Sequence, residues 1–246
     1  MNTTRKSILT NALLATVGLF FFGFGVYLTI QANIGVGPWD ALSLGLSKTF
    51  GIKYGTASIT VSFIILFIDI MLREQIGIGM VLDALLVGKA VDLFNYINLV
   101  PLQQKLIPGL IIMIAGMFIM GFTQYLYMKA GLSCGPRDSL LVGLSRRMKK
   151  VPIGVISICM LAVVTFTGWL LGGPIGIGTL ICAFLAGPIM QLDFKLVRFD
   201  ATQIKHQDII TSFKILITGD NKVTVEPAEQ ADASLLKSED VTPPAL

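Results

Sequence analysis

The chain of 246 residues is 54% hydrophobic and only 14% charged, whereas about 25% of the residues in soluble domains are charged. Its mean hydropathy of +0.77 excludes an ordinary soluble enzyme and excludes disorder over most of the length. The three cysteines, Cys134, Cys159 and Cys182, are an odd number without CxxC or Cys/His spacing, so neither a disulfide framework nor a zinc site is indicated.

The charges are distributed unevenly along the chain. Residues 1–198 carry a net charge of +8, whereas residues 199–246 carry −4. Because the basic residues of the first part stand between long apolar stretches, a lipid bilayer with anionic headgroups is the expected partner, and nucleic acid is not.

Transmembrane segments account for most of residues 1–198. The first apolar stretch, Ser7 to Trp39, has no charged residue over 33 positions, and one helix of about 50 Å would exceed a hydrocarbon core of about 30 Å. The break at Gly35-Val36-Gly37-Pro38 therefore predicts a first span over Ile8–Ile30 and a short helix over Pro38–Phe50. Further long spans are expected at Tyr54–Leu72, Gly79–Leu99, Ile107–Met128, Pro152–Leu171 and Gly178–Leu196.

An internal repeat organises these spans. With an offset of 98, 12 of the 26 residues from Gly23 to Lys48 are identical to those from Gly121 to Arg146. The fold class predicted is an all-α polytopic membrane protein of about six transmembrane helices in two repeated halves, residues 1–100 and 101–198, each with a short broken or re-entrant helix. Three long spans per half would invert the second copy, whereas counting the short helix as a span would make the repeat parallel.

The basic residues predict an orientation for the inverted arrangement. With the N-terminus in the cytoplasm, the outer side receives only Lys48, Lys53 and Lys105. The cytoplasmic side receives the larger basic set: Arg5, Lys6, Arg73, Lys129, Arg137, Arg146, Arg147, Lys149, Lys150, Lys195 and Arg198. Both termini are then cytoplasmic, in the plasma membrane.

A Gly-Pro-x-Asp motif begins each short helix: Gly37, Pro38 and Asp40 in the first copy and Gly135, Pro136 and Asp138 in the second. Glycine permits a bend, proline suits the first helical position, and an aspartate near the third can cap free amides. The motif is thus compatible with a repeated helix cap. It is equally compatible with two broken helices that meet near the membrane midplane and contact a small solute or ion.

The third span contains Asp83, Lys89 and Asp92, which have no charged counterparts in the second half. Intramembrane ionisable groups are by default candidates for ion or proton relays; alternatively, Lys89 and Asp92 pair on one face or extend to the interface. Asp69, close to Arg73 and Glu74 at a span end, is expected at the interface. The IleGlyIleGly segments at 76–79 and 175–178 are expected at helix entries.

The remaining features argue against catalysis. The single histidine, His206, follows the spans, so no catalytic residue, metal site or cofactor is predicted. Residues 199–246 form a separate cytoplasmic tail, with a possible hairpin at 213–225 and an acidic, disordered end from about 226.

The segment Ile34-Gly35-Val36-Gly37-Pro38-Trp39-Asp40-Ala41-Leu42, followed by Gly45-Leu46-Ser47, resembles the signature of the bacterial YczE-like membrane proteins of the YczE/YyaS/YitT group. The resemblance covers roughly residues 8–197 and implies a bacterial inner-membrane protein. It carries over no binding residue, and the second copy departs from it at Arg137.

The leading functional hypothesis is a transporter-like protein for an unidentified small solute or ion. The alternative is a non-transporting membrane regulator or scaffold that recruits a cytoplasmic protein partner through the basic loop Arg146–Lys150 and the acidic tail.

Overall fold

The structure, a computed structural model, describes residues 3–74, 76–130, 135–148 and 150–197. These residues form helices and connecting loops, without a strand. The helices are α1 (Thr3–Gln31), α2 (Pro38–Phe50), α3 (Tyr54–Met71), α4 (Ile78–Ile97), α5 (Leu106–Lys129), α6 (Pro136–Arg147), α7 (Ile153–Leu170) and α8 (Ile177–Leu196). The hairpin and acidic end predicted for the tail lie outside the described residues.

Among the described residues, five helices are long and apolar enough to cross a membrane. They are α1 from Thr10 onward, α3, α5, α7 and α8. The sixth expected span corresponds to α4, which has 20 residues but also contains Asp83, Lys89 and Asp92. Its length suffices for a crossing, but its charge density separates it from the other five.

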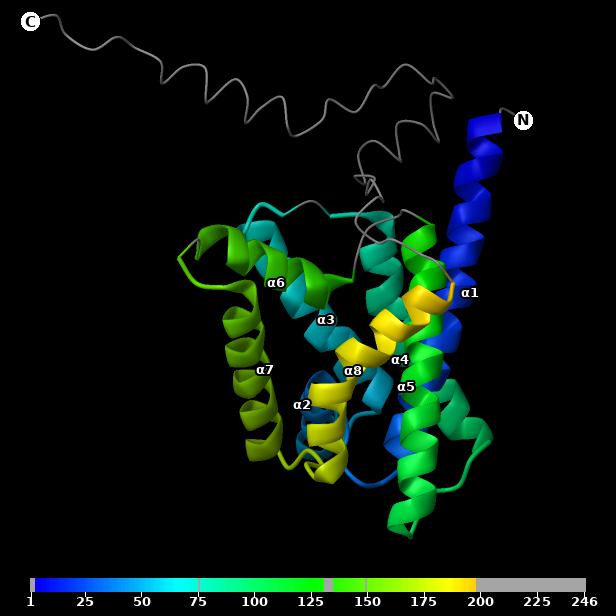
Figure 1. The fold of residues 1–246 in the computed structure, drawn as a ribbon, viewed down its shortest axis with the longest axis vertical. Coiled ribbons are helices and arrows are strands. Elements are labelled where there is room, and N and C mark those ends of the chain that lie inside the picture. The colour runs from blue at the N-terminus through cyan, green and yellow to red at the C-terminus, as the bar shows by residue number, and fades with distance from the viewer. Residues whose placement is uncertain (1–2, 75, 131–134, 149, 198–246) are drawn as a thin grey trace, which may run out of the picture.

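The long helices form an antiparallel bundle (Figure 1). Helix α1 packs against α5, which runs in the opposite direction, and also against α4; α5 packs against α8 in turn. The short helices α2 and α6 lie toward opposite ends of the bundle, which we call the α2 end and the α6 end (Figure 1).

Glycines bring α1 and α5 into backbone contact. A Cβ atom on Gly25 would lie 2.8 Å from the Gly116 carbonyl oxygen, and one on Gly116 would lie 2.8 Å from the Gly25 carbonyl oxygen. Small residues of this kind permit close van der Waals packing between membrane helices, where no hydrophobic force drives association. Beside this crossing, Leu19, Tyr27 and Val91 are completely buried in the largest apolar cluster.

Each short helix packs against a long helix of the opposite half. Helix α2 lies on α7, and α6 lies on α3. At the α2–α7 contact, a Cβ atom on Gly45 would lie 2.7 Å from the Gly168 carbonyl oxygen, so the contact is again between backbones. With 13 residues, α2 is about 20 Å long, too short to cross the hydrocarbon core alone.

Substitution of Gly116 with leucine should destabilise the bundle, because its side chain would collide with the Gly25 backbone. Overpacking of this kind costs about 1–3 kcal/mol, and we expect a lower midpoint of thermal unfolding in detergent. Gly154→Leu is the matched control, since a Cβ atom there has no neighbour within 4 Å. Equal midpoints for the two variants would contradict the close contact between α1 and α5 at Gly25 and Gly116.

Candidate functional site

The two Gly-Pro-x-Asp motifs place their glycines at the N-caps of α2 and α6. Gly37 and Gly135 have φ angles of −59° and −66°, which any residue can adopt. The sharp bend is instead at Gly35, whose φ is +107°. Cβ atoms on Gly37 and Gly135 would lie 3.2 Å from an Asp40 oxygen and 3.0 Å from an Asp83 oxygen, so a side chain at either position would require that carboxylate to shift slightly.

The carboxylate of Asp40 bonds across the bundle and not within its own helix. Its Oδ1 accepts a hydrogen bond of 2.8 Å from the Tyr54 hydroxyl at the start of α3. The side chain is only 7% exposed. The helix-cap interpretation therefore does not describe the hydrogen bonding of Asp40, although its place in the first turn still favours a negative charge.

Arg137 joins the two motifs. Its Nη1 lies 3.9 Å from Asp40 Oδ1, and its guanidinium lies 5.4 Å from the centre of the Trp39 ring, within the range of a cation–π interaction. Trp39 and Arg137 occupy the same position of the two motifs. The residue at which the second copy differs from the first, Arg137, therefore contacts its own counterpart, Trp39.

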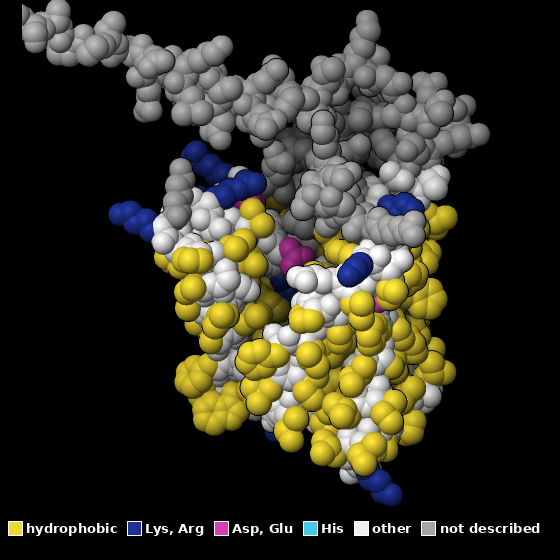
Figure 2. All heavy atoms as spheres, in the orientation of Figure 1, with side chains coloured by type: hydrophobic (Ala, Val, Ile, Leu, Met, Phe, Trp, Pro, Cys, Tyr) yellow, Lys and Arg dark blue, Asp and Glu magenta, His cyan; other side chains and the backbone are white. Residues whose placement is uncertain are grey.

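A cavity of about 410 Å³ lies beside these residues. Gly37, Pro38, Trp39 and Asp40 of the first motif line it together with Arg137 and Asp138 of the second. Gln124 adds an amide, and the rest of the wall is largely apolar and includes Met117, Met120 and Met190. In Figure 2, acidic side-chain atoms are visible in a hollow on this face of the molecule.

A smaller cavity of about 130 Å³ adjoins the first and shares Gln124, Arg137 and Asp138 with it. Its wall also contains Gly135, Asp83 and Tyr127. Three carboxylates, those of Asp40, Asp83 and Asp138, therefore surround a region that contains one guanidinium. Of the six motif residues, Pro136 is absent from both linings and is fully buried.

The larger cavity is flanked by α7 and α8, which are loosely packed. Cβ atoms placed on Gly154 and Gly187 would have no neighbour within 4 Å among the described residues. In the first half, by contrast, α3 and α4 are in backbone contact, since a Cβ atom on Gly88 would lie 2.7 Å from the Gly55 carbonyl oxygen. Helix α8 changes direction along its length (Figure 1) and contains Pro188 in its interior, which removes a helical hydrogen bond.

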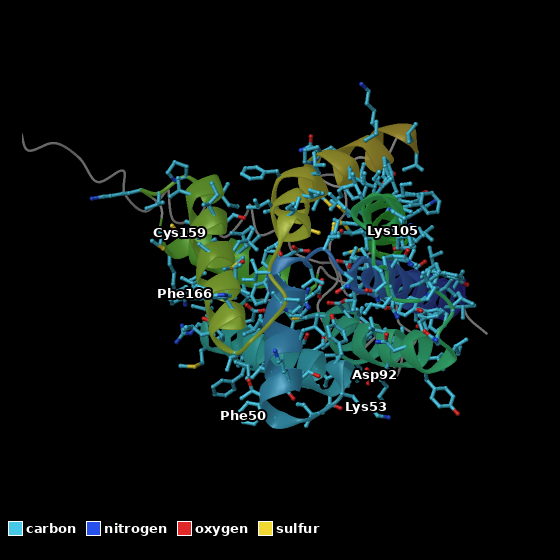
Figure 3. The ribbon with its side chains drawn as sticks, turned by 90° about the horizontal axis from the view of Figure 1, so that it is seen from below. Phe50, Lys53, Asp92, Lys105, Cys159 and Phe166 are labelled. Carbon is cyan, nitrogen blue, oxygen red and sulfur yellow. The ribbon has the colours of Figure 1, made fainter. Side chains whose placement is uncertain are left out.

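Lys89 and Asp92 lie outside both cavities. Asp92 Oδ1 accepts a hydrogen bond of 2.8 Å from the Gly55 backbone N–H, and Figure 3 shows Asp92 near Lys53, at the start of α3. Lys89 is exposed, and no ion pair joins it to Asp92 among the described residues. The possible pairing on one helix face is therefore wrong, because Asp92 instead bonds to the neighbouring helix.

Asp69 lies near the end of α3, where an interfacial position is expected, but it is covered by protein. Its side chain is completely buried, and neither carboxylate oxygen has a hydrogen-bond partner within the described structure. Helix α6 packs across α3 and covers it, and Arg146 bonds to the nearby Glu74 at 3.0 Å. A single sequence cannot reveal that a second helix covers this end.

The sequence patterns do not single out three further polar residues near the site: Tyr54, Gln124 and the buried Asp193. Tyr54 carried a usable signal, a polar residue at the start of a span, but its partner Asp40 is 14 positions away in another helix. Asp193 lies against Gly121 of α5, and its Oδ2 has no hydrogen-bond partner in the part of the chain that the structure describes. Within the described residues, no group of three or more His, Cys, Asp or Glu side chains is arranged to hold a metal ion.

The lateral surface is apolar, as a bilayer requires. Phe166 on α7 is 58% exposed, and Figure 3 shows Phe166 and Cys159 at the outer edge of the molecule. A groove of about 610 Å³ between α2, α3, α6 and α7 has an apolar lining that includes Trp39.

Comparisons with known proteins identify relatives over most of the membrane region. The profile of a family of unknown function, DUF6198, matches residues 9–194. The "Uncharacterized membrane protein YczE" of Bacillus subtilis is 34% identical, over 71% of this chain and 80% of its own. The "Uncharacterized protein YyaS" of B. subtilis is 29% identical over 74% and 90%, and an "Uncharacterized protein" of Haemophilus influenzae is 27% identical over 73% and 81%. No solved structure matches significantly.

Proposed function

The chain belongs to the DUF6198 family, and we propose that it is a transporter-like membrane protein that moves a small solute or ion through the cavity between its two halves. The observation that carries this proposal is the cavity of about 410 Å³ lined by both Gly-Pro-x-Asp motifs. Transporters with inverted repeats commonly bind substrate where broken helices of the two halves meet. The proposal involves no catalytic reaction and no cofactor.

The packing of the helices supports an inverted repeat within the proposal. If the first four helices are exchanged with the last four, the α1–α4 contact becomes α5–α8 and the α2–α7 contact becomes α6–α3. All four of these contacts are present. Helices α1 and α5 also run in opposite directions, as an inverted pair should (Figure 1).

We place the α6 end in the cytoplasm of the bacterial cell. The described basic residues that are exposed at this end include Arg73, Lys129, Arg146 and Arg147, and Figure 2 shows Lys and Arg side chains gathered mainly there. Lys48 and Lys53 are exposed toward the opposite end. The positive-inside rule favours this orientation, which also places both chain ends on the cytoplasmic side.

Labelling of introduced cysteines tests the orientation. In a variant without native cysteines, Lys48→Cys should react in intact cells with a membrane-impermeant maleimide, whereas Arg147→Cys should react only after permeabilisation. The two positions are both polar and exposed, so they are matched in chemical access. The reverse pattern would contradict the orientation, and labelling of both from outside would contradict the inversion.

Transport also requires a second conformation, and the loose α7–α8 contact provides for one. In the proposed repeat, Gly55 and Gly88 of α3 and α4 correspond to Gly154 and Gly187 of α7 and α8. The first pair is in contact and the second is open. We therefore expect a state in which α7 closes on α8 through these glycines while α3 and α4 separate.

A disulfide between Gly154→Cys and Gly187→Cys tests this closure. In a background without native cysteines, mild oxidation of membranes should crosslink the pair, and solute flux should then fall to the background rate and recover after reduction. Each single-cysteine variant is the control and should keep its flux under oxidation. Complete crosslinking without loss of flux would contradict the closure.

The transport assignment is tested by flux measurements in proteoliposomes. A screen of ions, amino acids, vitamins and sugars should identify a solute whose flux is lost in the Asp40→Asn/Asp138→Asn variant, because both carboxylates line the cavity. We expect a reduction of about 100-fold or more, the loss of two charged contacts at about tenfold each. Glu74→Gln, which neutralises a carboxylate outside both cavities, is the matched control and should keep its flux.

The same measurement separates transport from the scaffold hypothesis. Exposed arginines at the α6 end favour a regulator that recruits a cytoplasmic protein, although Arg146 and Arg147 also bond to Glu74 and to the Leu72 carbonyl oxygen. If the screen detects no solute flux, and neutralisation of Arg146 and Arg147 abolishes crosslinking to a cytoplasmic protein in cells, the scaffold assignment replaces transport.

A further inference from the structure

We propose that the cavity binds a small organic cation with an apolar body. This inference deepens the proposed transport function and rests on it for its biological meaning, but the binding site stands on its own geometry. Three observations support it: the charge balance of the cavity walls, the free carboxylate of Asp138, and the size and apolar character of the remaining wall.

The first observation is an excess of negative charge. Among the described residues, the charged side chains that line the two adjoining cavities are those of Asp40, Asp83 and Asp138 and one basic side chain, that of Arg137. Asp40 is buried and Asp83 is half-buried, and carboxylates with restricted access to water favour partners of opposite charge. A bound cation supplies part of the positive charge that the protein itself does not.

The second observation is that Asp138 lines the cavity and has no bonded partner among the described residues. It is exposed and lines both cavities. Neither of the ion pairs within the described part of the chain involves it. Asp40, by contrast, already accepts the Tyr54 hydroxyl and lies beside Arg137, so Asp138 is the carboxylate best placed for an incoming positive group.

The contact between Arg137 and Trp39 shows how the protein itself accommodates such a group. The guanidinium carries a delocalised charge and lies 5.4 Å from the indole centre and 3.9 Å from Asp40 Oδ1. An alkylammonium group is bound by the same kinds of partner. A carboxylate balances its charge, and an aromatic ring face packs against its weakly hydrated surface. Trp39 also lines the cavity, so its ring is available to a bound ligand cation as well as to Arg137.

The third observation excludes a simple metal ion as the best occupant. A volume of about 410 Å³ is far larger than one dehydrated ion, and Mg²⁺ or Ca²⁺ requires about six or more oxygen ligands. The wall instead offers methionine side chains, including Met117, Met120 and Met190, which are polarisable and adapt to irregular apolar groups. An anion is disfavoured as the occupant, because the lining would expose it to three carboxylates and one guanidinium.

Three probes with one branched skeleton isolate the effect of charge. Choline is cationic, 3,3-dimethylbutan-1-ol is its neutral carbon analogue, and 3,3-dimethylbutanoate is the corresponding anion. Binding to the purified full chain in nanodiscs is measured by calorimetry, together with tetramethylammonium and benzyltrimethylammonium as smaller and larger cations. We expect at least one ammonium probe to bind at least ten times more tightly than the neutral analogue, with no binding of the anion.

The variant Asp138→Asn should weaken binding of that ammonium probe at least tenfold, whereas Asp138→Glu should retain part of it because the charge remains. Glu74→Gln is the matched control and should leave affinity unchanged. The three variants are compared only after each elutes as folded protein with the unfolding midpoint of the parent. If all three ammonium probes fail to bind, or if the neutral or anionic probe binds as tightly, the cation assignment is overturned.

Flux distinguishes this failure from failure of the transport proposal. A neutral or anionic solute that crosses the membrane in an Asp138-dependent manner would overturn the cation site and leave transport in place. Asp138-dependent binding of an ammonium probe without flux of any cation would support the site and overturn transport. Flux of an ammonium probe that is lost in Asp138→Asn and kept in Glu74→Gln would support both.

Discussion

The contact between Asp40 and Arg137 is the interaction on which the candidate site depends. It joins the first turn of α2 to the first turn of α6, at 3.9 Å between Nη1 and Oδ1. Since α2 and α6 each pack against a long helix of the opposite half, the pair brings both Gly-Pro-x-Asp motifs to one cavity. Separated charges would be costly in an apolar bundle, so the pairing also restrains how far the motifs can part.

The long helices and the starts of the short helices could be predicted because their causes are local. Apolar length gives the spans, and Pro38 and Pro136 begin α2 and α6 as the sequence indicates. The IleGlyIleGly segments likewise lead into α4 and α8. These features depend only on a few neighbouring residues and on the known thickness of a bilayer, so they can be predicted without knowledge of tertiary contacts.

The site was predictable only in part, because charge partners depend on which helices meet. The sequence identifies the motif aspartates and Asp83 as candidates for contact with a solute or ion, and all three line the adjoining cavities. Asp92 bonds to Gly55 of the neighbouring helix, so it cannot be assigned from its spacing to Lys89. Asp69 is buried under a helix from the other half, and Tyr54 reaches an aspartate on α2.

The differences between the halves carry more functional information than their similarities. Where the first half has Lys89, the second has Pro188 at the aligned position, and α8 bends while Gly154 and Gly187 remain unpacked. Where the first motif has Trp39, the second has Arg137, and the two side chains lie against each other. A perfectly symmetric repeat would place two indoles or two guanidiniums together. The asymmetric pair instead provides one aromatic surface and one fixed cation. Together with the three carboxylates of the cavity lining, they form a wall suited to a positively charged ligand.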